Sequence, residues 1–131
     1  MGYTLIIGER TGNGGAQEIT LPQAPVFAGD ELTGQSNKRQ LSSRAFEEFC
    51  AATGLSAILS QPLKRQHPGS LEITRTLVSQ IAVAQRTYEK RHRLPAGFGP
   101  FHDAHKARLR WLCWWMEWAL RTCRQPVLAH R

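Results

Sequence analysis

His102 and His105 stand three residues apart, a spacing found in metal sites on helices. A zinc site takes three or four convergent ligands, so a third ligand must lie close by. Cys113 is on the same expected helix, but helical rise places it about 15 Å from the first turn. We therefore predict no metal and no cofactor, and His102 and His105 are the candidates if a metal does bind.

Catalysis would need a nucleophile beside a base, or two carboxylates that share acid and base roles. Most of the ten carboxylates fall at expected capping or surface positions. The sequence therefore predicts a protein that is not an enzyme, and a small metal-dependent enzyme is an alternative. The five histidines are scattered over expected loops and helix ends, at His67, His92, His102, His105 and His130.

The glycine-rich residues 11–15 follow an expected strand, as phosphate-binding loops do. In such loops a Lys-Ser or Lys-Thr pair follows, and a helix N-terminus holds the anion. Here neither pair follows, and residues 18–21 have the composition of a strand. Because Asn13-Gly14 favours positive φ angles, we predict a hairpin turn.

Positive charge is concentrated in the second half of the chain. The net charge is +7, and residues 61–131 hold 13 of the 17 basic residues and 4 of the 10 acidic ones. Such asymmetry attracts anionic partners, and the alternative is a solvated face that keeps the protein soluble. No helix-turn-helix, zinc-finger or RNA-recognition signature accompanies the charge, so sequence-specific reading of nucleic acid is not predicted. The candidate binding residues are Arg75, Arg86, Lys90, Arg110, Trp114, Arg121 and Arg124, with Phe98 in the loop 93–102.

Four tryptophans stand within eight residues near the C-terminus. Indole rings bind cations and stack on nucleobases, so a ligand cage is one interpretation. Trp111, Trp115 and Trp118 share one helix face at spacings of four and three, which favours core packing. Trp114 borders that face and is the tryptophan expected to contact a partner.

An N-terminal β-hairpin and an irregular segment are expected before the helices. Residues 3–7 and 18–21 are predicted as the strands of the hairpin. Residues 22–41 contain prolines and glycines with little apolar periodicity, which predicts an irregular segment that wraps the domain.

Three helices are predicted in residues 42–131. The first begins with Ser42 or Ser43 as N-cap and ends at Gly54. The short apolar patch from Leu55 to Pro62 is a helical turn or a strand, and periodicity leaves both open.

The second helix is predicted to start with Ser70 as N-cap and to run to about residue 91. Its apolar face comprises Ile73, Leu77, Ile81, Ala84 and Tyr88. Its opposite face comprises Arg75, Ser79, Arg86 and Lys90.

The third helix is predicted from Asp103, as N-cap, to residue 124 before Pro126. Apolar residues cover more than half its circumference, so it belongs inside the domain. Lys106 falls in the narrow sector expected to face solvent. Arg108 projects into the apolar sector, where an unpaired charge is costly. We expect it either to pair with Glu47, Glu48 or Glu72 or to extend its side chain out to solvent.

Composition favours one domain over residues 1–131. Hydrophobic residues make up 41% and charged residues 21%, as in ordinary globular domains. No apolar run approaches the roughly 20 residues of a membrane-spanning helix. Cys50, Cys113 and Cys123 form no CxxC pair, which favours the cytoplasm. We predict an α+β fold in which a β-hairpin (1–21) and an irregular segment (22–41) pack on a helical core (42–131) with a buried tryptophan-rich C-terminal helix.

Several stretches of residues 67–127 are similar to known sequences. They are His67-Pro68-Gly69 before a helix, DAHKARLRWL at 103–112, WMEWAL at 115–120 and Pro126-Val127. These stretches resemble small uncharacterised proteins encoded by tailed bacteriophages and prophages. The resemblance implies no activity or catalytic residue, but it implies a context in which such proteins disable a host factor, form part of a virion or handle nucleic acid.

The function predicted from these observations is binding without catalysis. The resemblance implies that the protein is phage-encoded. It would then occupy a host or defence protein, or a nucleic acid, through its basic helical faces. The alternative is a virion structural protein, a head or tail accessory component. No membrane partner is predicted, and the oligomeric state is left open.

Overall fold

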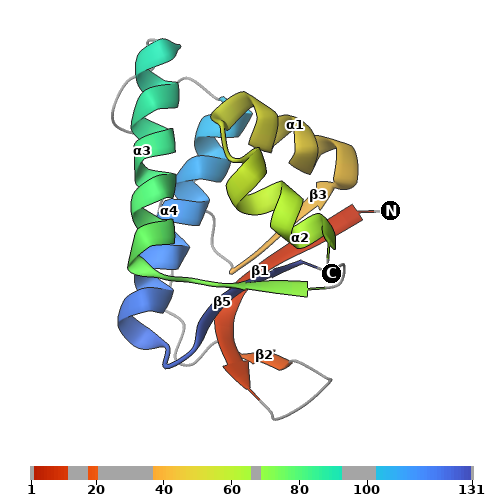
Figure 1. Cartoon of the computed structure of the whole chain (residues 1–131), viewed down its shortest axis with the longest axis vertical. Helices are drawn as coiled ribbons and strands as arrows, with labels where there is room; N and C mark the ends of the chain where they lie inside the picture. The colour runs from red at the N-terminus through yellow and green to blue at the C-terminus, as the bar shows by residue number, and fades with distance from the viewer. Residues whose placement is uncertain (1, 12–17, 21–36, 66–68, 93–102, 131) are drawn as a thin grey trace.

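The computed structural model describes residues 2–11, 18–20, 37–65, 69–92 and 103–130, which form one sheet with helices packed against it (Figure 1). The described elements, in chain order, are β1 Gly2–Thr11, β2 Glu18–Thr20, β3 Lys38–Ser42, α1 Ser43–Thr53, the π-helix η1 Ser56–Ser60, α2 Gln61–Arg65, β4 Gly69–Glu72, α3 Arg75–Arg91, α4 Ala104–Thr122 and β5 Pro126–His130. The predicted α+β class is confirmed, and it includes a buried tryptophan-rich helix, α4.

Strand β1 organises the sheet, in which all described pairs are antiparallel. One edge of β1 pairs first with β3 and then, nearer its C-terminal end, with β2. The other edge pairs with β5, which in turn pairs with β4. The β1–β2 pairing confirms a hairpin, but it joins residues 9–11 to β2, whereas the predicted strand 3–7 pairs with β3 and β5. The predicted turn at Asn13-Gly14 lies outside the described residues.

Strands β3, β4 and β5 were not expected from the sequence. The predicted irregular segment 22–41 is wrong at its end, because Lys38–Ser42 is a strand, and residues 22–36 lie outside the described part. Asn37 fixes this strand to β1, since its Nδ2 donates to the carbonyl of Ile7 at 2.9 Å and its own carbonyl accepts from the Ile7 N–H at 3.0 Å.

Strand β5 lies in the middle of the sheet, between β1 and β4, and all five of its residues are buried. Leu128 joins the core beneath the helices, while Val127 and Ala129 are also buried. A strand covered on both faces shows no alternation of polar and apolar residues, so periodicity could not identify it. The sequence had predicted a helical core for residues 42–131, but this part of the chain also contains strands.

Helix α1 has the predicted boundaries. Ser42 is its N-cap, and its hydroxyl accepts a hydrogen bond from the N–H of Ala45 at 3.0 Å. Gly54 ends it with φ of +75°, a left-handed conformation that glycine adopts without steric cost. The apolar patch that follows is helical and forms η1, and Pro62 does not close it but lies in the first turn of α2, where proline is tolerated.

Helix α3 starts later than predicted. Ser70 is not its N-cap, because Ser70 lies in β4 and its Oγ accepts a hydrogen bond from Arg10 Nη2 at 2.8 Å. Thr74 caps the helix instead, and its Oγ1 accepts from the N–H of Leu77 at 3.0 Å. Ile73 therefore precedes the helix, and its N–H donates to the carbonyl of Pro126. Pairing with β5 thus decides which hydroxyl caps α3.

Helix α4 begins as predicted, with Asp103 accepting a hydrogen bond from the N–H of Lys106 at 2.9 Å. It ends at Thr122, so Arg124 lies beyond it. The exposed fractions of Trp111, Trp115 and Trp118 are 1%, 2% and 7%, which confirms the predicted buried ridge.

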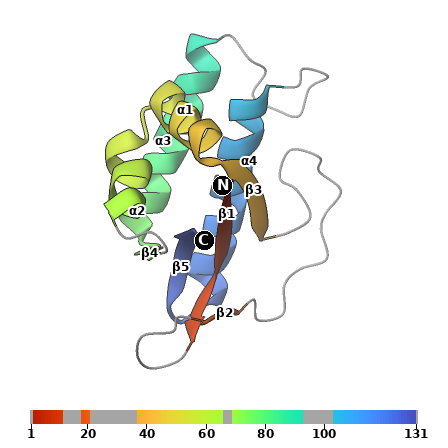
Figure 2. The same ribbon diagram turned by 90° about the vertical axis from the view of Figure 1, so that its right-hand side faces the viewer.

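The hydrophobic core lies between the sheet and the helices. Leu5, Ile7 and Leu128 contribute to it from the sheet, and α1, η1, α2, α3 and α4 contribute the rest. Figure 2 shows α4 running along one side of β1 and β5. None of the described helices combines the length and apolarity needed to cross a membrane.

Candidate binding groove

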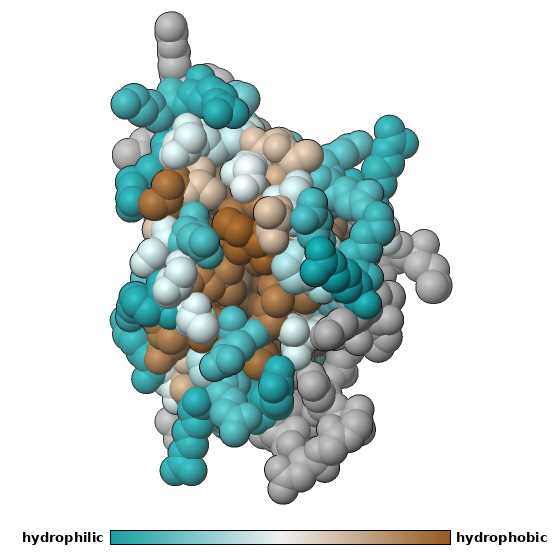
Figure 3. All heavy atoms as spheres, in the orientation of Figure 1, coloured by the Kyte–Doolittle hydropathy of each residue, from teal (hydrophilic) through white to brown (hydrophobic). Residues whose placement is uncertain are grey.

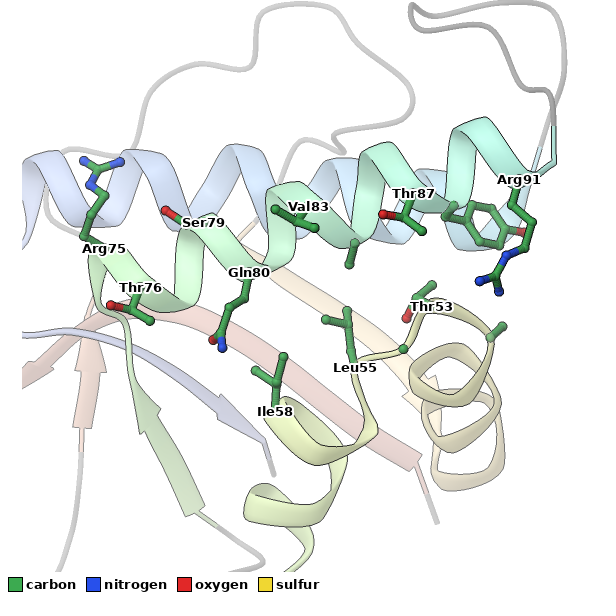
Figure 4. A pocket seen from close by; sticks show the side chains of 14 residues that line it. Thr53, Leu55, Ile58, Arg75, Thr76, Ser79, Gln80, Val83, Thr87 and Arg91 are labelled. Atoms are coloured by element: carbon green, nitrogen blue, oxygen red, sulfur yellow. The ribbon is translucent and has the colours of Figure 1, made fainter.

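A groove of about 590 Å³ runs along α3, facing the C-terminal end of α1 and η1; we call it the α3 groove. Leu55, Ile58 and Ala84 form its apolar base, in which Leu55 is fully buried and Ile58 and Ala84 are partly exposed. The exposed face of the molecule in Figure 3 shows this hollow as apolar surface rimmed by hydrophilic side chains. The close view in Figure 4 shows Leu55 and Ile58 directed toward the helix that carries Val83.

Val83 is an exposed apolar residue on the wall of the α3 groove. Its exposed fraction is 51%, and it is the exposed large apolar side chain among the described residues. The buried face of α3 lies elsewhere on the helix and includes Leu77, Ile81 and Tyr88. Val83 therefore contributes no core packing, and an apolar side chain beside a hollow with an apolar base is typical of a contact surface.

Polar groups without charge complete the α3 side of the groove. Thr76, Ser79, Gln80 and Thr87 line it. These side chains can donate and accept hydrogen bonds. Thr53, across the groove, is different, because its Oγ1 donates to the carbonyl of Phe49 at 2.7 Å within α1.

The two ends of the α3 groove are cationic. Arg75 begins α3 and Arg91 ends it, and Figure 4 shows them at opposite ends of the row of lining side chains. Among the described residues that line the groove, none is acidic. Arg75 also pairs with Glu117 of α4, with 3.5 Å between Nη1 and Oε1, and both side chains are largely exposed.

The predicted basic positions of α3 lie beside this groove. Arg75, Arg86 and Lys90 are exposed and fall within one narrow sector of the helix; we call them the basic strip. The strip borders the wall formed by Val83 and Thr87. The structure thus brings these three predicted residues together, next to a groove that the sequence did not reveal.

The predicted binding residues of α4 differ in their exposure. Arg110 is largely buried and pairs with Glu89 of α3, with 3.3 Å between Nη2 and Oε1. Trp114 is partly buried and packs edge-on against Trp115, with ring centroids 4.8 Å apart. Arg121 and Arg124 are exposed. Phe98 lies outside the described residues.

One prediction about charge in α4 is wrong, and one of the two alternatives for Arg108 is not found. Lys106, expected in the solvent sector, is only 1% exposed, because a helical wheel does not show what packs on the first turn. Arg108 forms no ion pair with the three expected acids in the described structure. Glu47 pairs with Lys64 at 2.8 Å, and Glu48 pairs with Arg44 at 3.0 Å.

Arg108 lies instead near a second guanidinium. Burial lowers the pKa of Arg39 from its ordinary value, and the charge of Arg108 lowers it further. Burial also lowers the pKa of Arg108. Both arginines are half-buried, so each keeps part of its charge in water, as long basic side chains do by extending outward.

A polar cluster joins the end of α3 to the start of α4. The Tyr88 hydroxyl donates to both carboxylate oxygens of Asp103 at 3.1 Å, and burial together with this carboxylate raises the pKa of Tyr88 to about 12. The rings of His92 and His105 lie 4.2 and 5.9 Å from that of Tyr88, measured between centroids. Within the described ranges no three potential metal ligands come together, and His102 lies outside them.

The three cysteines are free thiols in the structure. Burial raises the pKa of Cys50 and of Cys113 to about 12, and that of Cys123 to about 11. Thiolate is the reactive form of cysteine, so these thiols are poor nucleophiles near neutral pH.

Comparison of the chain with protein-family models, with curated proteins and with solved structures gave no match. Only one wall of the groove has a local sequence signal, because Val83 interrupts the polar face of α3. Its partners Leu55 and Ile58 come from a segment whose structure periodicity left open.

Proposed function

We propose that this protein is a binding protein without catalytic activity of its own, which holds an acidic partner protein against the exposed face of α3. The observation that carries the proposal is the α3 groove, in which an exposed valine, an apolar base and two terminal arginines occur together without an acidic lining residue. Such a surface removes apolar area from water when it is covered, and its charges select an anionic partner.

A protein partner fits this surface better than a nucleic acid. Nucleic-acid sites are strongly positive, and those for single strands present aromatic rings for base stacking. Here Arg110 is largely buried and pairs with a glutamate, and Trp114 packs on Trp115. The remaining basic groups border an apolar groove, which suits side chains rather than phosphates.

The resemblance to phage-encoded proteins supports a host protein as the partner and the host cytoplasm as the place of action. Occupying such a protein would need no chemistry beyond complementary contact. On this proposal the basic strip raises the rate of encounter, and the α3 groove provides the close contact.

Site-specific photo-crosslinking tests this function. A benzophenone amino acid is placed at Val83 and, as a control, at Arg44, whose exposed side chain lies on α1 away from the groove. In the native host we expect a protein adduct from position 83 but not from position 44, and we expect the double variant R86E/K90E to reduce it. An adduct that nuclease removes, or equal adducts from both positions, would contradict the proposal.

A further inference from the structure

We propose that the α3 groove binds an amphipathic helix of the partner, whose apolar stripe covers Val83 and whose carboxylates reach Arg75 and Arg91. This inference rests on the proposed function and specifies the partner's chemistry. Helix-in-groove recognition uses apolar side chains that recur every three or four residues along one face. The length, the apolar base and the charged ends of the groove each fit such a helix.

The length follows from α3 itself. Arg75 and Arg91 are the first and last residues of this 17-residue helix, so they lie about 24 Å apart along its axis. A partner helix of about four turns spans that distance. Between these ends the base is formed by Leu55 and Ile58, from the facing segment, and by Ala84.

The polar wall argues against a lipid chain as the occupant. Thr76, Ser79, Gln80 and Thr87 line the groove beside Val83. Covering these hydroxyl and amide groups with a hydrocarbon chain would remove them from water without replacement hydrogen bonds, which is unfavourable. The polar flanks of an amphipathic helix can supply such bonds.

Charge complementarity identifies the partner as acidic. The side chain of Arg91 has no hydrogen bond or ion pair to another residue in the described ranges. Arg75 has a neighbouring carboxylate in Glu117, at 3.5 Å, but its side chain is 66% exposed and accessible to a second one. Guanidinium groups bind carboxylates through paired hydrogen bonds, so an acidic side chain near each end of the partner helix would satisfy both.

Lys90 provides a matched control. It is adjacent to Arg91, carries the same charge and is exposed. As part of the basic strip it affects the rate of encounter, but it does not line the groove and so makes none of the close contacts. Changing either residue to glutamate alters the net charge of the protein equally. A general electrostatic attraction would respond alike to both changes, whereas docking in the groove depends on Arg91.

The probe is a synthetic helical peptide of about 16 residues, with leucines along one face and a glutamate near each end of that face. Binding is measured by titration calorimetry, and its location by amide chemical-shift changes. We expect changes at Gln80, Val83 and Thr87. We also expect Arg91→Glu to weaken binding by about tenfold or more, and Lys90→Glu by less than about threefold. Val83→Asp should also abolish binding, and circular dichroism verifies that each variant remains folded.

Four comparison ligands provide the results that would overturn the inference. A peptide with lysines in place of the glutamates, a peptide with scrambled leucines, oleate and a single-stranded oligonucleotide are tested on the same variants. Failure of the acidic peptide to bind better than its lysine or scrambled counterparts overturns the inference, as does equal loss in the Arg91 and Lys90 variants. If only the binding of oleate or of the oligonucleotide depends on Arg91, the groove has a different occupant and the inference is overturned. If position 83 still crosslinks a protein in cells, the proposed function survives the loss of the helical partner.

Discussion

Glu89 of α3 and Arg110 of α4 form an ion pair across the interface between these two helices, with 3.3 Å between Oε1 and Nη2. The side chains are 10% and 21% exposed, respectively. Gln85 Nε2 also donates to the same carboxylate at 3.2 Å. The pair therefore differs from the exposed Arg75–Glu117 pair at the other end of the same interface.

Glu89→Gln should lower the free energy of unfolding by about 1–3 kcal/mol, because it leaves a largely buried guanidinium without its charged partner. Glu117→Gln is the control, and it should cost less than about 1 kcal/mol, as exposed pairs contribute little. Urea denaturation of both variants measures the difference. Equal losses would show that burial does not distinguish the two pairs.

Tyr88 should make stability depend on pH in the alkaline range. Its pKa is about 12 in the folded protein, above the ordinary tyrosine value of about 10, so the folded state retains a proton that the unfolded state loses. Stability from this group is present below pH 10 and is lost as the pH rises toward 12. Tyr88→Phe should show a smaller loss than the wild type over that window in thermal unfolding. If the stability of the two proteins falls equally with pH over this window, Tyr88 is not the group responsible.

The cost of substituting Gly54 should depend on its backbone conformation and not on steric crowding around the new side chain. A Cβ atom at this position would have no heavy atom within 4 Å, but φ is +75°. Gly54→Ala should therefore lower the free energy of unfolding by about 1 kcal/mol, and Gly54→Asn by less, because asparagine adopts this conformation more readily. Chemical denaturation of both variants tests the order, and a larger loss for asparagine would contradict it.

Substitution of a buried tryptophan should destabilise the protein more than substitution of the partly buried Trp114. Trp111→Ala should lower the free energy of unfolding by about 3–5 kcal/mol, because it opens a cavity in the core. Trp114→Ala should cost about 1–2 kcal/mol, since this side chain is only partly buried. Acrylamide quenching of the native protein should decrease most in Trp114→Phe. Strong quenching that persists in this variant would show that the buried ridge is accessible to solvent.

Much of the helical framework was predictable because its signals are local. Ser42, Gly54 and Asp103 act on backbone groups only a few residues away, and each is found in its predicted role. The buried face of α4 follows from the spacing of Trp111, Trp115 and Trp118, so periodicity alone placed it in the core.

The candidate site was predictable only in part. Arg75, Arg86 and Lys90 were identified because they recur on one face of one helix. The α3 groove was missed, since it requires Leu55 and Ile58 to face Val83 across a gap of more than twenty residues in sequence. Nothing in either segment alone indicates that they meet.

The amino-acid sequence by itself determined the caps of α1 and α4, the amphipathic faces and the charge distribution, because these depend on neighbours within one or two helical turns. Tertiary structure decided which of Ser70 and Thr74 caps α3, where β5 lies, that Lys106 is buried and that Val83 borders a hollow. Each of these outcomes depends on contacts between distant segments, and only packing of the whole sheet against its helices brings those segments together.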